Sequence, residues 1–217
     1  MSRTTSRPAS ESTDVSARIS PSRRSFLQAS FLGGMGAAVL SACSANDSLA
    51  QQANAGDNKN YIAGDGSVTE YAQTERKAPV VIAGRLFDGT AVDSKAWAGR
   101  VAVLNFWYAA CSPCRLEAPR LETLYKEFTP EGVLFYGVNI RDREPEAAAF
   151  ERTFGITYPS MQDTDGGVLL AMTQYVPPQA VPTTLVIDKA GKVASRILGL
   201  ADQSTLKALI TDALAGK

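Results

Sequence analysis

A continuous apolar run over residues 101–107 constrains the fold of this chain most strongly. The run is interrupted only by Asn105, which is typical of a central strand buried on both faces. A helical pattern follows at once, because large apolar side chains recur at i, i+3, i+4 and i+7 between residues 121 and 128. This pattern predicts a helix over 112–128. A buried strand that leads directly into a helix predicts an α/β domain with parallel strands.

The neighbouring segments extend this α/β pattern. Before the central strand, Val80–Ile82 and Arg85–Phe87 flank Ala83-Gly84 and precede the turn signal Asp88-Gly89, which predicts a small N-terminal β-hairpin. After it, periodicity and turn residues predict strands over 133–139, 184–188 and 193–198, and helices over 144–154, 166–175 (capped by Asp165) and 202–214. The fold class is therefore α/β, with a central mixed sheet flanked by helices.

The composition excludes several kinds of site. The chain of 217 residues has no histidine, so it cannot build a Ser-His-Asp triad, a Cys-His nucleophile pair or a His-ligated zinc or haem site. Its 22 basic and 22 acidic residues give zero formal charge, which argues against a nucleic-acid binder. Three cysteines are an odd number, and the unpaired one needs its own explanation.

The N-terminal part has the features of an export signal. Arg23 and Arg24 precede a moderately apolar stretch of 15 residues, Phe26–Leu40, which is shorter than the roughly 20 residues of a membrane span. The arginine pair resembles a twin-arginine signal, and Leu-Ser-Ala-Cys ending at Cys43 resembles a lipobox. We expect residues 1–42 to be removed and Cys43 to carry the lipid. The alternatives are an ordinary signal peptide with an incidental cysteine, or a buried helix.

Composition also divides the rest of the chain. Residues from 44 to about 60 are mainly Ser, Ala, Asn, Gln, Asp and Gly, which is typical of a linker. We therefore expect a lipidated Cys43 and a flexible tether over 43–78, and a single domain over 79–217. About 140 residues suffice for one hydrophobic core.

The remaining two cysteines form a Cys-Ser-Pro-Cys segment at residues 111–114, between the central strand and the helix. Free N–H groups at a helix start favour a thiolate, so Cys111 can attack a disulfide and Cys114 can resolve the mixed disulfide. A zinc site is one alternative, but it would need two further ligands, and the absence of histidine and of a fourth cysteine argues strongly against it. A purely structural disulfide is the other alternative, although so short a loop gains little stability from closure.

Residues 105–119 resemble the active-site segment of the thioredoxin superfamily, and are similar to TlpA/ResA-like thiol–disulfide oxidoreductases. The resemblance extends over about residues 79–215. It is supported by Gly-Val-Asn at 137–139, Gly-Ile-Thr-Tyr-Pro at 155–159 and Val-Pro-Thr-Thr at 181–184, and by the turn at 188–192. It implies a thioredoxin-like fold with an inserted helix at 144–154.

The resemblance also implies roles for individual residues. Cys111 would be the nucleophile and Cys114 the resolving thiol, joined as a disulfide when oxidised. Pro182 would be a cis-proline facing that disulfide, and the backbone of Val181 would pair with a bound substrate segment. Trp107 would belong to the core with one edge near the site. The alternative for Pro182 is an ordinary trans proline in a loop.

Glu117 occupies the position of an acid that lies near the cysteines in ResA-like proteins, where a carboxylate can relay a proton. The alternative is a solvated helix glutamate. Asn105 stands where thioredoxins have a buried acid, which favours the ResA-like branch. The chain departs from the family at Ala110, where a tryptophan is usual, and at Tyr108; both positions bear on substrate preference.

The resemblance implies a lipid-anchored thiol–disulfide oxidoreductase on the outer face of the cytoplasmic membrane. We expect a monomeric reductase that has no metal and no cofactor beyond its own disulfide. A membrane thiol carrier of the DsbD/CcdA kind would supply electrons, and exported proteins with thiols or disulfides, apocytochromes c among them, would be the substrates. The alternatives are an oxidase that uses the same pair, a thioredoxin-like binding lipoprotein without enzymatic activity, and a peroxiredoxin, which the Cys-x-x-Cys spacing fits poorly.

Overall fold

The computed structural model describes residues 64–217. The predicted signal peptide with Arg23 and Arg24, the predicted lipid site at Cys43 and the first part of the predicted tether lie outside the described residues. No helix between residues 64 and 217 is long and apolar enough to cross a membrane.

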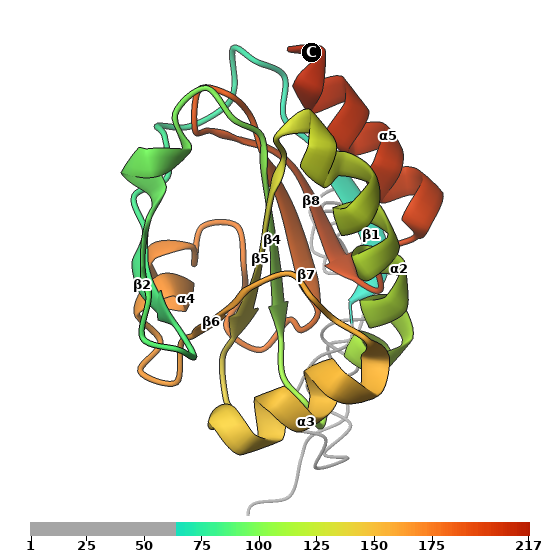
Figure 1. Ribbon diagram of the computed structural model, residues 1–217. Coiled ribbons are helices and arrows are strands. Elements are labelled where there is room, and N and C mark those ends of the chain that lie inside the picture. Colours follow the sequence, from blue (N-terminus) through green and yellow to red (C-terminus); the bar gives the residue numbers. More distant parts are fainter. Residues whose placement is uncertain (1–63) are drawn as a thin grey trace, which may run out of the picture. The chain divides into compact units, whose positions relative to one another are not determined.

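An eight-stranded mixed sheet forms the centre of the described domain, in the order β1-β8-β7-β4-β5-β6-β2-β3 (Figure 1). Pairing is parallel between β4 and β5 and between β5 and β6, and antiparallel elsewhere. This confirms the predicted α/β class with a mixed sheet. The strands are β1 (Asp65–Glu70), β2 (Ala83–Leu86), β3 (Ala91–Asp93), β4 (Ala102–Trp107), β5 (Leu134–Asn139), β6 (Ser160–Gln162), β7 (Thr183–Ile187) and β8 (Val193–Gly199).

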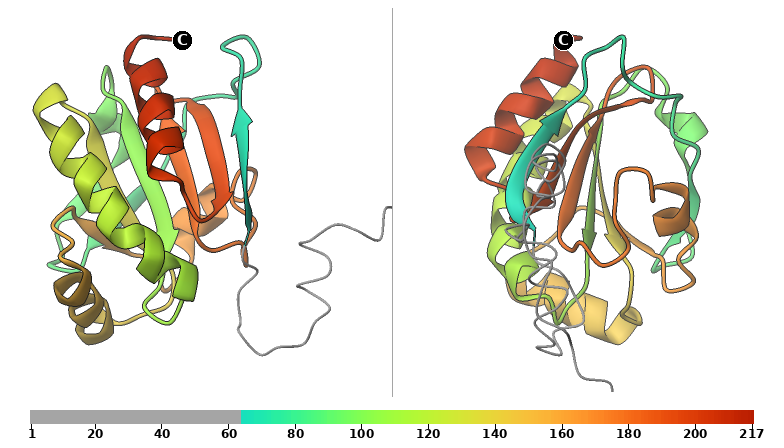
Figure 2. Two further views of the ribbon diagram at one scale, coloured as in Figure 1. Left: turned by 90° about the vertical axis from the view of Figure 1, so that its right-hand side faces the viewer. Right: turned by 180° about the vertical axis from the view of Figure 1, so that it is seen from behind.

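Helices cover both faces of this sheet. The α-helices are α2 (Ser112–Phe128), α3 (Glu144–Phe154), α4 (Gly167–Ala171) and α5 (Gln203–Leu214), and short 3-10 turns occur at η1 (Ser94–Trp97) and η2 (Thr129–Glu131). Helices α2 and α5 lie side by side on one face, while α4 and η1 lie on the other (Figure 2). Alternate side chains of β4 face opposite sides of the sheet. Val103 packs with side chains of α2 and α5, and Leu104 packs with those of α4.

The helices with the clearest apolar period begin and end as predicted. Both α2 and α3 have the predicted bounds, and α5 starts after its cap Asp202, whose side chain accepts hydrogen bonds from the N–H groups of Ser204 and Thr205. Helix α4 differs, because it covers only 167–171 of the predicted 166–175. Its N–H groups at Val168 and Leu169 donate to the buried carboxylate of Asp163, at 2.7 and 2.8 Å, and Asp165 accepts only from Gly167.

The domain begins earlier than the predicted boundary at residue 79. Strand β1 pairs with β8 from Ser67 opposite Leu198 to Glu70 opposite Ser195, so the prediction of a flexible tether up to residue 78 is wrong for this segment. The strand escaped prediction because it is polar and only partly buried at the edge of the sheet, and therefore has no apolar alternation.

The predicted N-terminal hairpin is present, with different strand bounds. Strands β2 and β3 are joined through Asp88-Gly89, where Gly89 has a φ of +86° that favours glycine. Ala83 and Gly84 belong to β2 itself rather than to a connection. The predicted strand over 80–82 is absent, because these residues bond to side chains and loops instead: the N–H of Val80 donates to the carbonyl of Gly191 and that of Ile82 to the Ser94 hydroxyl.

Candidate active site at the start of helix α2

The two cysteines form a disulfide at the junction of β4 and α2. Cys111 and Cys114 are bonded to each other, with their Cα atoms 5.3 Å apart, and both are buried. Cys111 is the N-cap of α2, and its Sγ accepts a hydrogen bond from the N–H of Cys114 at 3.3 Å. Pro113 fits in the first helical turn because its missing N–H needs no partner there. A thiolate at Cys111 would therefore face the unpaired N–H groups and the positive end of the helix dipole.

The segment before β7 lies against this disulfide. The Val181–Pro182 peptide bond is cis, and the Cys111 Sγ lies 3.9 Å from the carbonyl oxygen of Val181. Pro182 in turn accepts a hydrogen bond from the N–H of Gly199 at 2.8 Å, which joins the segment to β8. The fold thus brings together Cys111, Val181 and Pro182, which are about 70 residues apart in the sequence.

Glu117 is buried rather than solvated. It is only 1% exposed, and its two carboxylate oxygens accept hydrogen bonds from the Asn105 side-chain amide at 2.7 Å and from the N–H of Ala201 at 2.9 Å. Asn105 also donates to the Thr184 hydroxyl at 3.1 Å. Burial raises the pKa of Glu117 to about 8, because the hydrogen bonds and the positive charge of Arg120 only partly offset the loss of hydration. The carboxyl can therefore gain or lose a proton near neutral pH.

Trp107 packs beside the cysteines within the core. Its ring is 3% exposed and lies 4.4 Å, centroid to centroid, from the ring of Phe150 on α3. It belongs to one apolar cluster with Cys111, Cys114 and Val181. The tryptophan therefore contributes to the wall behind the disulfide, and the inserted helix α3 supports it.

The structure adds residues that the sequence analysis did not single out. Asp142, just after β5, and Arg115 on α2 both hydrogen bond to the backbone of Ala109, and the Arg141 guanidinium lies 4.2 Å from the centroid of the Tyr108 ring. The signal that could have indicated Asp142 is topological: the carboxyl ends of neighbouring parallel strands meet at one edge of a sheet, so the residues after β4 and β5 lie together.

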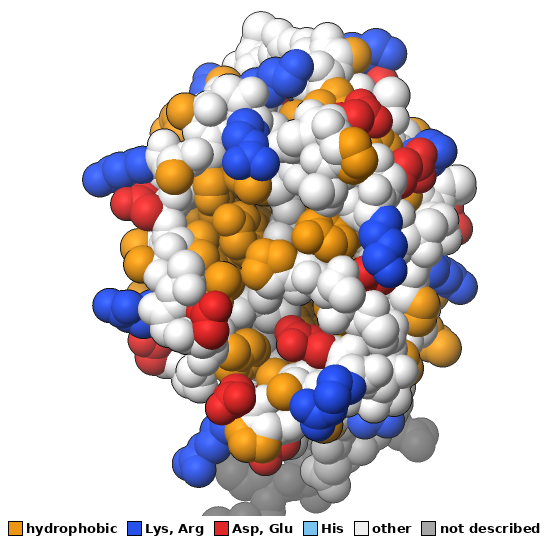
Figure 3. Space-filling view, in the orientation of Figure 1, with side chains coloured by type: hydrophobic (Ala, Val, Ile, Leu, Met, Phe, Trp, Pro, Cys, Tyr) orange, Lys and Arg blue, Asp and Glu red, His pale blue; other side chains and the backbone are white. Residues whose placement is uncertain are grey.

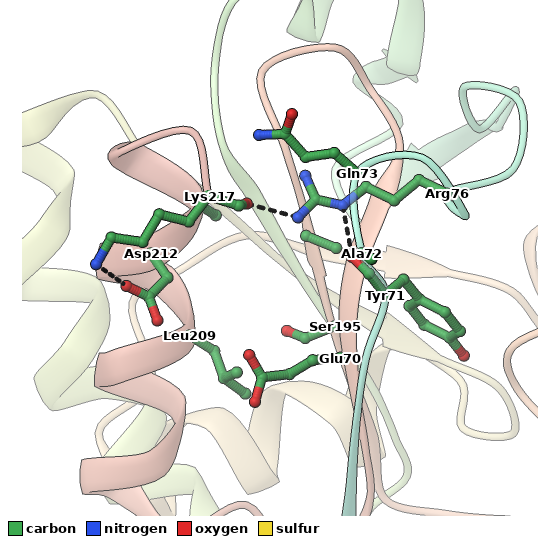
Figure 4. A pocket seen from close by; sticks show the side chains of 11 residues that line it. Glu70, Tyr71, Ala72, Gln73, Arg76, Ser195, Leu209, Asp212 and Lys217 are labelled. Carbon is green, nitrogen blue, oxygen red and sulfur yellow. Dashed lines mark hydrogen bonds and ion pairs between the residues drawn. The ribbon is translucent and has the colours of Figure 1, made fainter.

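The pocket between β1 and α5 lies apart from the predicted site residues. A pocket of about 440 Å³ lies between β1 and α5, and Figure 4 shows that Arg76 and Lys217 on its wall already have partners. None of the predicted site residues lines it. Basic and acidic side chains are mixed over the face shown in Figure 3. Between residues 64 and 217, no group of three or more Cys, Asp or Glu is placed to hold a metal ion.

These features define the class of protein. A Cys-x-x-Cys disulfide that follows the central strand and starts a helix, with a cis-proline before the adjacent antiparallel strand, is the arrangement of a thioredoxin-like fold. The chain belongs to the AhpC/TSA family, whose sequence profile matches residues 74–196.

Individual relatives agree with this assignment. The chain is 34% identical to the thiol-disulfide oxidoreductase ResA of Bacillus subtilis over 50% of its own length and 58% of the relative. It is 30% identical to ResA of Bacillus cereus over 60% of its length and 72% of the relative. A secreted thiol-disulfide isomerase from Corynebacterium glutamicum is structurally similar, with a TM-score of 0.61 and 26% identity over 70% of this chain and 95% of that one. The chain thus spans less than two thirds of the B. subtilis relative.

Proposed function

We propose that this protein is a thiol–disulfide oxidoreductase that works through Cys111 and Cys114. The observation that carries the proposal is the disulfide at the N-terminus of α2, with the Val181 carbonyl 3.9 Å from the Cys111 sulfur. The names of the relatives, thiol-disulfide oxidoreductase and thiol-disulfide isomerase, support the same activity.

The proposed reaction is two successive thiol–disulfide exchanges. In the reduced protein the Cys111 thiolate attacks a substrate disulfide, forms a mixed disulfide and releases the first substrate thiolate. The Cys114 thiolate then attacks the Cys111 Sγ, which releases the second substrate thiolate and forms the Cys111–Cys114 disulfide. The substrate gains two electrons and the protein loses two. The two protons from the protein thiols end on the substrate thiols.

Glu117 is the proposed proton carrier for these steps. Its pKa of about 8 lies close to the ordinary pKa of a thiol, near 8.5, so the two groups can exchange a proton at little cost. The described chain has no histidine to serve instead. The backbone of Val181 is proposed to receive the substrate segment, with the peptide groups before Pro182 pairing to it as an added strand, and Trp107 is proposed to border the site with one edge of its ring.

The wider setting is proposed from the sequence features and the relatives. The protein would be anchored through a lipid on Cys43 after export directed by Arg23 and Arg24, and would act outside the cytoplasmic membrane. The relative from C. glutamicum, which is described as secreted, supports an extracytoplasmic location. We propose the reducing direction, with electrons from a membrane thiol carrier of the DsbD/CcdA kind and with exported protein disulfides, apocytochromes c among them, as substrates. The dithiol would need no other cofactor.

A trapping experiment tests the activity. The Cys114→Ser variant keeps the nucleophile but cannot resolve, so it should accumulate a mixed disulfide through Cys111 when mixed with a disulfide substrate. The matched Cys111→Ser variant should trap nothing, because it lacks the proposed nucleophile at the N-cap of α2. No adduct with Cys114→Ser, as expected of a pure binding protein, would contradict the proposal.

The direction is tested separately, by the reduction potential of the Cys111–Cys114 pair. A potential near that of thioredoxin, about −270 mV, agrees with a reductase, whereas one near that of DsbA, about −120 mV, makes the protein an oxidase.

A further inference from the structure

The turn that leads into Cys111 is held by the loop after the neighbouring strand. This turn, Tyr108–Ala110, connects the end of β4 to the first cysteine. The N–H of Ala109, two residues before Cys111, donates to Oδ2 of Asp142 at 2.5 Å. Asp142 belongs to the loop after β5, so the contact joins the ends of two parallel strands.

The position of Asp142 is itself fixed by the end of β5. Its Oδ2 also accepts a hydrogen bond from the Asn139 side-chain amide at 2.9 Å, and its own N–H donates to Asn139 Oδ1 at 2.8 Å. Asn139 is completely buried, and the N–H of Ile140 donates to the carbonyl of Trp107, which continues the ladder between the strands. One carboxylate oxygen therefore receives two donors, one from the turn after β4 and one from the last residue of β5.

The other side of the turn is held by the helix that follows. Nε of Arg115 donates to the carbonyl of Ala109 at 2.9 Å, and the N–H of Cys111 donates to the carbonyl of Tyr108 at 3.1 Å. Both polar backbone groups of Ala109 are thus bound by side chains. Ala110 is exposed and has only a methyl group, so its side chain cannot anchor the turn.

We propose that Asp142 is a positioning residue for thiol–disulfide exchange, which fixes the turn that presents Cys111 beside Val181. The inference rests on the proposed function. In the oxidised protein the disulfide to Cys114 also restrains Cys111. Once that bond is broken, the backbone of the turn and the N–H of Cys114 hold the thiolate at the helix start, and small displacements of a reacting atom slow a reaction strongly. Asp142 should therefore matter most when the protein is reduced.

The test compares two substitutions of the same residue in the full chain. Asp142→Ala removes the acceptor, whereas Asp142→Asn keeps one oxygen that can receive both N–H groups. The rate constant for reaction of the reduced protein with oxidised glutathione should fall at least tenfold in Asp142→Ala and stay within about threefold of the original protein in Asp142→Asn. Asp165→Ala, which removes a carboxylate that likewise accepts a backbone N–H but lies in another loop, should not change the rate.

The outcomes separate the inference from the proposed function. A folded Asp142→Ala variant that reacts at the original rate, or an Asn variant that is slowed as much as the Ala variant, overturns the positioning role. If Asp142→Ala does not fold, Arg115→Ala decides, because it removes the other side-chain hydrogen bond to Ala109 from an exposed position. An unchanged rate there would show that the turn needs no side-chain support and also overturns the inference. A parent protein that shows no exchange contradicts the proposed function itself.

Discussion

At the scale of single residues, Glu117 links the site to the stability of the fold. Its pKa is about 8 in the folded protein, raised by burial, against 4.5 for a free glutamate. Between these values the folded state holds a proton that the unfolded state releases. The stabilising contribution of the protonated carboxyl is therefore complete below about pH 4.5 and is lost as the pH rises through 8.

We accordingly predict that the free energy of unfolding falls between pH 5 and 8, and that Glu117→Gln removes most of this fall. Each unit of pKa difference corresponds to about 1.4 kcal/mol, so the effect should reach a few kcal/mol. Urea unfolding of the oxidised form at several pH values measures it, because disulfide cysteines do not titrate. Burial also raises the pKa values of Asp163 and Glu151. Their contributions to the pH dependence are the same in both proteins, so they cancel when the two pH slopes are compared. Parallel slopes would show that Glu117 is ionised throughout.

The residues of the site differ in how far the sequence could indicate them. Cys111 and Cys114 form a local motif, and Glu117 sits three residues beyond it, so their proximity follows from the helix alone. Asp142 carries no such signal, because its contact with Ala109 depends on the pairing of β4 with β5 and on the path of the loop between. One hydrogen bond of the buried Glu117 carboxylate likewise comes from Ala201, 84 residues away, which no local pattern specifies.

At the scale of elements, the prediction failed where elements are short or lie at an edge. Helix α2 has a full apolar period and α3 has a proline in its first turn, and both have the predicted bounds. Strand β6 has three residues and β1 is polar and half exposed, so neither shows a periodic pattern. The turn Asp88-Gly89 locates the hairpin, but the predicted strand before it is misplaced, because Val80 and Ile82 pack on the core without joining a ladder and Val81 is exposed.

Helix α4 provides a prediction at this scale, because its N-cap residue is Gly166, and the side chain that binds its first N–H groups most closely is that of Asp163 rather than Asp165. Asp163 is 2% exposed, and its two oxygens receive the N–H groups of Val168 and Leu169. Asp163→Ala would leave both donors without their partner and should lower the free energy of unfolding by about 1–2 kcal/mol. Asp165→Ala, the matched control, should change it by less than about 0.5 kcal/mol, since Asp165 binds a single exposed N–H at 3.2 Å. If urea unfolding shows the same loss of unfolding free energy for both variants, Asp163 stabilises the start of α4 no more than Asp165 does.

At the scale of the whole described domain, the segment before residue 79 closes one edge of the fold. Strand β1 covers the edge of β8. Arg76 donates to the Asp188 carboxylate at 2.8 Å, and both side chains are largely buried. Nε and Nη2 of Arg76 also reach the carbonyls of Tyr71 and Lys217. One guanidinium thus connects the residue after β1, the β7–β8 turn and a residue beyond α5; Figure 4 shows its contacts with Tyr71 and Lys217.

This arrangement predicts that a chain beginning at residue 79 is less stable than one beginning at residue 64. Removal of residues 64–78 exposes the β8 edge and leaves the Asp188 carboxylate without its guanidinium. Each net hydrogen bond contributes about 1 kcal/mol, so loss of the β1–β8 ladder and of the Arg76 contacts should lower the free energy of unfolding by at least about 2 kcal/mol. Urea unfolding of the two oxidised chains measures the difference.

Arg76→Ala in the longer chain separates the two causes: it should reproduce part of the loss, because it removes the ion pair but leaves β1 on the sheet. Equal unfolding midpoints for the two chains would place the boundary of the stable domain at residue 79 and make β1 dispensable to the fold.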